Sequence, residues 1–101
     1  MMRMIPITLG NGVTALGIEV KLPKTTLLSV STDKGYIMCG ALDVGLLNDR
    51  LKDREIIAGR AVGVRTLEEL LEAPLESVTT TAETLGILVG MKGIDALELM
   101  V

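Results

Sequence analysis

The sequence predicts an α+β fold with a mixed β-sheet, an N-terminal hairpin, a β-α-β unit and C-terminal helices. Short apolar runs rich in β-branched residues fill the first third of the chain, a strand–helix–strand pattern spans residues 36–62, and helix caps recur in the last third. A chain of 101 residues is long enough for one domain. We expect a β region over residues 1–33 and an α/β part over residues 34–101.

A hairpin is expected to open the chain. Residues 3–9 form a short apolar run, and Pro6 indicates an edge strand because proline cannot donate a hydrogen bond to a neighbouring strand. Asn11 and Gly12 are a two-residue hairpin signal. Both faces of the strand expected at residues 13–20 are largely apolar. We therefore expect both faces to be covered, one of them by a second subunit.

The middle of the chain has the pattern of a strand, a turn, a strand, a helix and a strand. After a break at residues 22–24, these are expected at residues 26–32, 33–35, 36–39, 40–53 and 56–62. Asp43 lies in the first turn of the expected helix, where a negative charge suits the positive end of the helix dipole. The strands on either side of that helix are expected to be parallel neighbours joined by a right-handed crossover.

Three short helices are expected in the last third of the chain. Residues 66–69 have the form of a capping box, followed by an apolar stripe and by Pro74. Residues 79–81 offer caps for the next helix, in which we expect Ala82 and Leu85 to point inward and Gly86 to end the helix. The final helix follows a loop at residues 90–93.

The composition excludes several classes of function. Hydrophobic residues make up 49% of the chain, but the longest uncharged run, residues 4–18, is broken by proline, asparagine and glycine and is too short to span a membrane. We find no signal peptide pattern and expect a cytoplasmic, soluble protein whose apolar excess serves a homo-oligomer. A net charge of −3, dispersed cations and a single aromatic residue argue against a nucleic-acid partner.

The scarcity of reactive side chains narrows the chemistry further. The chain has no histidine and one cysteine, which excludes Ser-His-Asp and Cys-His catalysis, histidine metal sites and an intrachain disulfide. We expect no metal, and the residues point to no particular cofactor. A lone thiol is typical of a reducing compartment.

Two long stretches of the sequence are similar to the YunC-like family of small bacterial and archaeal domains, which have no assigned function. The first is Lys34-Gly35-Tyr36-Ile37-Met38-Cys39-Gly40-Ala41-Leu42-Asp43. The second is Asp53-Arg54-Glu55-Ile56-Ile57-Ala58-Gly59-Arg60-Ala61-Val62-Gly63-Val64-Arg65. The resemblance implies an α/β domain whose N-terminal β region mediates formation of a tetramer. It implies no reaction, substrate or cofactor.

A candidate site lies where the two expected parallel strands end. Cys39 and Gly40 end the first strand, Arg60 lies near the end of the second, and parallel strands end at the same edge of a sheet, where ligands commonly bind. Helix N-termini near Asp43 and just after Arg65 would add N–H groups, a combination that suits a small anion. The same field would favour the nucleophilic thiolate of Cys39.

Each candidate also has a structural interpretation. Cys39 can be a core residue, because free cysteine is among the most buried residue types. Arg60 and Arg65 can pair with acids or with a neighbouring subunit, and Asp43 can simply start its helix. Lys34 and Tyr36, at the start of the first parallel strand, can contact a ligand, but a single tyrosine more often anchors a core or an interface.

Three functions remain open from the sequence. The first is the binding of a small anionic metabolite near Cys39 and Arg60. The second is an enzyme in which Cys39 is the nucleophile, although no base for it is evident. The third is a structural or protein-interaction subunit without a small-molecule site.

Overall fold

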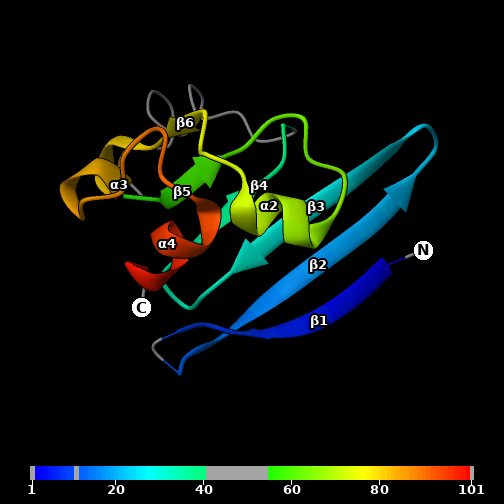
Figure 1. Ribbon diagram of the computed structural model, residues 1–101, viewed down its shortest axis with the longest axis horizontal. Helices are drawn as coiled ribbons and strands as arrows, with labels where there is room; N and C mark the ends of the chain where they lie inside the picture. Colours follow the sequence, from blue (N-terminus) through cyan, green and yellow to red (C-terminus); the bar gives the residue numbers. More distant parts are fainter. Residues whose placement is uncertain (1, 11, 41–54, 101) are drawn as a thin grey trace.

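The computed structural model describes residues 2–10, 12–40 and 55–100. Six strands form one mixed sheet in the order β1-β2-β3-β4-β5-β6, which confirms the predicted α+β fold (Figure 1). Their bounds are β1 Met2–Thr8, β2 Thr14–Leu22, β3 Thr25–Ser31, β4 Gly35–Met38, β5 Ile57–Arg60 and β6 Ser77–Val78. The helices in the described residues are α2 Leu67–Glu72, α3 Thr80–Thr84 and α4 Gly93–Glu98.

The first hairpin places β1 at the edge of the sheet, as Pro6 predicts. Its loop is one residue longer than the two-residue turn expected from the sequence. The N–H of Leu9 still bonds the carbonyl of Val13 at 2.8 Å, and the N–H of Gly12 bonds the carbonyl of Leu9 at 3.0 Å. Gly12 has a φ of 84°, the left-handed conformation that closes three-residue hairpin loops.

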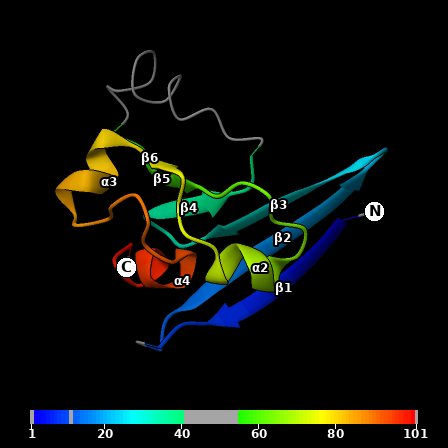
Figure 2. The same cartoon turned by 45° about the horizontal axis from the view of Figure 1, so that its top comes forward.

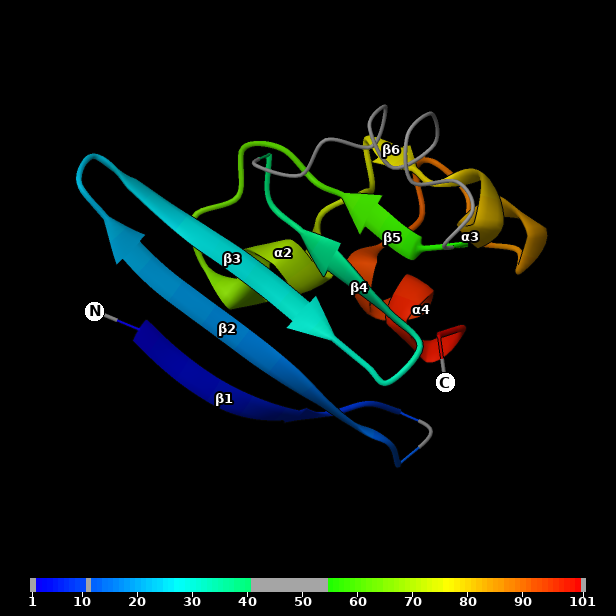
Figure 3. The same ribbon diagram turned by 180° about the vertical axis from the view of Figure 1, so that it is seen from behind.

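A long antiparallel arm formed by β2 and β3 extends beyond the rest of the sheet. The arm turns at Pro23 and Lys24, with Lys24 at a φ of 65°, so its strands stay paired up to Leu22 and Thr25. In contrast, β4 pairs only with the last three residues of β3, Ser29–Ser31. Figures 2 and 3 show the outer half of the arm reaching past the end of β4.

The expected parallel neighbours are present as β4 and β5, with Tyr36 opposite Ala58 and Met38 opposite Arg60. The strand expected at residues 56–62 is shorter, because the chain turns away from β4 after Ala61, whose N–H makes a last bond to the carbonyl of Met38 at 3.0 Å. Val62 is half exposed and Gly63 adopts a φ of 74°. The helix expected at residues 40–53 falls almost entirely in residues 41–54, outside the described residues.

Helices α2 and α4 cover one face of the sheet and enclose the core (Figure 1). Leu28, Val30 and Ile37 from the strands are fully buried there, as are Leu70 and Leu97 from the helices. The expected short helix after Thr79 is present as α3, and Ala82 is buried. The expectation for Leu85 is wrong: its side chain is 44% exposed because Leu85 is the C-cap residue, followed by Gly86 at a φ of 88°.

The other face of the N-terminal strands carries a row of apolar side chains. Met2 and Met4 are 61% and 58% exposed, and their partners in β2, Val20 and Ile18, are partly buried. No helix in the described ranges is both long and apolar enough to cross a membrane.

Candidate functional site

A cleft of about 510 Å³ lies between the outer half of the β2–β3 arm and the segment that joins β5 to α2. The tight turn at Pro23 and Lys24 sets Lys21 directly opposite Thr26 on the arm. Val64 and Arg65 form the facing wall, directly before the N-cap of α2. The described lining residues are Lys21, Leu22, Lys24, Thr25, Thr26, Val64 and Arg65.

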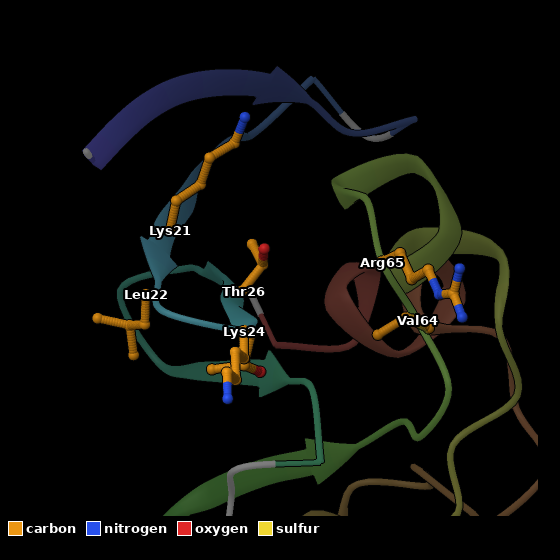
Figure 4. A pocket seen from close by; sticks show the side chains of 7 residues that line it. Lys21, Leu22, Lys24, Thr26, Val64 and Arg65 are labelled. Carbon is orange, nitrogen blue, oxygen red and sulfur yellow. The ribbon is translucent and has the colours of Figure 1, made fainter.

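Positive charge dominates this cleft. Three of the ten Lys and Arg residues in the chain line it, and none of its described lining residues is acidic. Within the described part of the chain, the side chains of Lys24 and Arg65 make no ion pair. Figure 4 shows the hydroxyl of Thr26 between the two walls and the three cationic groups spread around the rim, with the guanidinium of Arg65 turned outward. The long side chains of Lys24 and Arg65 have the rotamer freedom to turn toward an anion.

The thiol of Cys39 is buried on the helix-covered side of the sheet. Cys39 is 7% exposed, and its Sγ accepts a hydrogen bond from the backbone N–H of Leu28 at 3.5 Å. Cys39 also lines a second cavity, of about 310 Å³, which adjoins the cationic cleft. The described residues that line this second cavity include no acid and no base that could activate the thiol.

Arg60 lies on the opposite face of the sheet from the thiol of Cys39. Gly59 faces the core, because a Cβ built on it would meet the buried side chain of Leu75 at 2.8 Å, so the next side chain, that of Arg60, points the other way. Its guanidinium bonds the carbonyl of Gly40 at 3.1 Å and the carboxylate of Glu76 at 2.9 Å. The structure therefore brings Arg60 to Gly40 but does not bring it to the thiol.

Lys34 and Tyr36 lie at the other end of β4, away from Cys39. They border a separate cavity of about 320 Å³, whose described lining also includes the acidic residues Asp33 and Glu55. This mixture of charges favours an anion less than the cationic cleft does. Asp43, the remaining candidate, lies outside the described residues, and the ligand roles of all these residues stay predictions.

The N-terminus of α2 is capped by its own side chains. Thr66 Oγ1 accepts the N–H of Glu69 at 3.1 Å, and the carboxylate of Glu69 accepts the N–H of Arg65 at 2.7 Å. The expected capping box is thus present in part, because its acidic residue bonds the N–H of Arg65 instead of the N–H of the cap residue Thr66. Because Glu68 also lies in the first turn, this helix end carries negative charge. Any affinity of the cleft for anions must come from its side chains.

Sequence reasoning missed the part of this site that comes from the arm. Lys21, Lys24, Thr25 and Thr26 flank Pro23, and the segment was interpreted only as a break between two strands. A two-residue turn at Pro23 and Lys24 places both lysines and both threonines at one hairpin end. The clustering of cations on either side of a predicted turn was the available signal.

This chain is similar to proteins that have no assigned function. A family model described as a domain of unknown function, DUF1805, matches residues 38–100. The uncharacterized protein YunC of Bacillus subtilis (strain 168) is 60% identical over 97 residues, covering 96% of this chain and 95% of that protein. The crystal structure of a protein of unknown function, TA1206, from Thermoplasma acidophilum matches with a TM-score of 0.89 at 29% identity, covering 100% of this chain and 94% of that one.

Proposed function

The chain belongs to the DUF1805 family, as its resemblance to YunC-like domains predicts, and we propose that it binds a small anionic metabolite in the cationic cleft. One observation carries the proposal: Lys21, Lys24 and Arg65 surround a single cleft that has no acid among its described lining residues. The chain as a whole has a net charge of −3. Such a local concentration of positive charge is the electrostatic condition for anion binding.

The groups around the cleft suit a phosphate or carboxylate. A guanidinium can bond two oxygens of such a group at once, and lysine supplies a mobile point charge. The hydroxyls of Thr25 and Thr26 add hydrogen-bond donors. Hydrogen bonds to charged groups contribute roughly 1.5–3 kcal/mol each, so two or three of them suit a dissociation constant on the order of micromolar to millimolar.

A binding role is better supported than catalysis by Cys39. The thiol is 7% exposed, and no described residue around it has the properties of a general base. The geometry also favours the cleft over the vicinity of Arg60, because the guanidinium of Arg60 is already bonded to Gly40 and Glu76. The ligand site of this proposal therefore lies next to the cavity of Cys39, on the side away from Arg60.

We further propose that the protein is a cytoplasmic homo-oligomer, in the form of a tetramer, assembled through the open face of β1 and β2. The support is the exposure of Met2 and Met4 beside the partly buried Ile18 and Val20 on that face. Contiguous apolar surface of this kind is typical of subunit contacts.

Calorimetric titration with inorganic phosphate and with citrate tests the anion site. We expect Lys24→Gln and Arg65→Gln each to weaken binding at least about tenfold, because each removes one charge-assisted contact of roughly 1.5 kcal/mol or more. Lys34→Gln is the matched control, because it removes the same charge from a different cavity. Binding that is lost in Lys34→Gln and kept in the other two variants, or no binding of either anion, would contradict the proposal.

A further inference from the structure

The second cavity continues the cationic cleft and differs from it in chemistry. The two cavities share four lining residues, which are Leu22, Thr25, Thr26 and Val64. The other lining residues of the second cavity are Leu27, Cys39 and Gly40, whereas those of the first are the three cations. None of the described lining residues of the second cavity is therefore charged. A ligand can therefore lie with one part among cations and another against aliphatic side chains.

The second cavity also borders an unpaired stretch of strand. The last contact of β3 with the segment after β4 is made by Leu28, whose carbonyl accepts the N–H of Cys39 at 3.1 Å. Outward-facing backbone groups alternate along a strand, so the N–H and carbonyl of Thr26 point to the same side as those of Leu28. There β4 has already ended, at Met38. These backbone groups can bond the polar linkage between the two parts of a ligand.

We infer that the ligand is an amphipathic anion, a phosphate or carboxylate joined to a short aliphatic chain. The inference rests on the proposed anion site and adds the second part of the molecule. The anionic group occupies the cleft of Lys24 and Arg65, and the aliphatic chain of the ligand lies in the second cavity, between Leu22, Leu27 and Val64. With volumes of about 510 and 310 Å³, both cavities lie within the roughly 300–1,000 Å³ of small-molecule sites.

The lining of the second cavity predicts how the affinity depends on the length of the ligand's aliphatic chain. A fully buried methylene group strengthens binding about fourfold. Leu22 is 47% exposed and Val64 is only partly buried, so burial of the chain is incomplete. We therefore expect a gain of about two- to threefold per methylene, or on the order of 30- to 240-fold between methyl and hexyl phosphate.

Calorimetric titration with inorganic, methyl, butyl and hexyl phosphate, with hexanoate and with 1-hexanol tests the inference. We expect affinity to rise along the phosphate series, and 1-hexanol to bind far more weakly than hexyl phosphate. Comparison of hexyl phosphate with hexanoate distinguishes the two head groups. In an amide NMR spectrum, the hexyl compound is expected to shift Leu27 and Cys39, which line the second cavity but not the cationic cleft.

Two exposed leucines provide matched variants. Leu22→Ser should reduce the gain in affinity with the length of the aliphatic chain, because this side chain lines both cavities and supplies apolar surface without charge. Leu88→Ser, at a side chain that is 55% exposed and borders neither cavity, should leave that gain unchanged. Since both positions are exposed, neither change should unfold the protein.

The outcomes separate the two proposals. If inorganic phosphate binds but hexyl phosphate binds no better, the amphipathic ligand is overturned and the anion site stands. If 1-hexanol binds as tightly as hexyl phosphate, the cavity is purely apolar and the inference is overturned. If neither inorganic nor hexyl phosphate binds and hexanoate fails too, both proposals fall together.

Discussion

The backbone N–H of Leu28 donates a hydrogen bond to the Sγ of Cys39 at 3.5 Å, just beyond the point where β4 stops pairing with β3. If β4 were longer, this N–H would bond a backbone carbonyl of β4. Here a thiol satisfies it, and the carbonyl of Leu28 still accepts the N–H of Cys39. Cys39 thus satisfies both outward-facing backbone groups of Leu28 beside the second cavity, a structural role that does not depend on its reactivity.

The burial of Cys39 predicts that its thiol reacts slowly with alkylating reagents. In the native protein we expect alkylation by iodoacetamide to be at least about tenfold slower than in urea, because the reagent must wait for local opening of a 7% exposed side chain. The rate is measured by mass spectrometry at several urea concentrations. A native rate equal to or faster than the denatured rate would contradict this expectation and would restore the hypothesis of an enzyme with Cys39 as nucleophile.

A close approach of α4 to both α2 and β4 predicts an unusually costly glycine substitution. A Cβ on Gly93, the first residue of α4, would lie 2.5 Å from the carbonyl oxygen of Leu70 and 2.7 Å from Cδ1 of Ile37. Alanine favours a helix over glycine by about 1 kcal/mol, but the overlap with backbone outweighs this gain. We expect Gly93→Ala to lower the free energy of unfolding by about 1–3 kcal/mol in urea denaturation.

The matched control for this prediction is Gly40→Ala. The nearest atom to a Cβ on Gly40 is Nη2 of Arg60 at 3.7 Å, an ordinary contact with the end of a flexible side chain. Its stability should stay within about 0.5 kcal/mol of the parent protein. Equal effects of the two substitutions would show that the packing of α4 against the sheet is looser than described.

Local patterns were sufficient to predict most of the elements. The strands follow from apolar runs with β-branched residues, and the edge position of β1 follows from Pro6. The threonine caps of α2 and α3 lie where the sequence indicates them, at Thr66 and Thr79. These features depend on neighbouring residues, so a single sequence contains their signal.

The composition of the site depended on the register between distant strands. In the parallel pair, Met38 lies opposite Arg60, which places Arg60 on the face away from Cys39. A shift of one residue would have put Arg60 on the same face as Cys39. No local pattern encodes that register. The cleft of Lys24 and Arg65 likewise depends on a contact between segments about forty positions apart.

The open face of the N-terminal strands predicts where subunits meet. The N–H of Leu9 bonds Val13, and ladder bonds alternate along an antiparallel pair, so the position of Pro6 is one at which an N–H would face outward. Proline has none, which leaves the free edge of β1 a poor partner for a second strand. We therefore expect the face that carries Met4 and Ile18, rather than the edge, to form the interface.

Introduction of a charge on that face tests this expectation. Met4→Lys alters a side chain that is 58% exposed in the single chain, so it should leave the fold intact and place a charge in the proposed interface. Sedimentation velocity should show a tetramer for the parent protein and a shift of at least about tenfold in the dissociation constant for the variant. Leu88→Lys adds the same charge in the loop between α3 and α4, where the side chain is 55% exposed, and should not change the assembly. A parent protein that is monomeric at all concentrations would overturn the proposed assembly, and a Met4→Lys variant that stays tetrameric would move the interface away from this face.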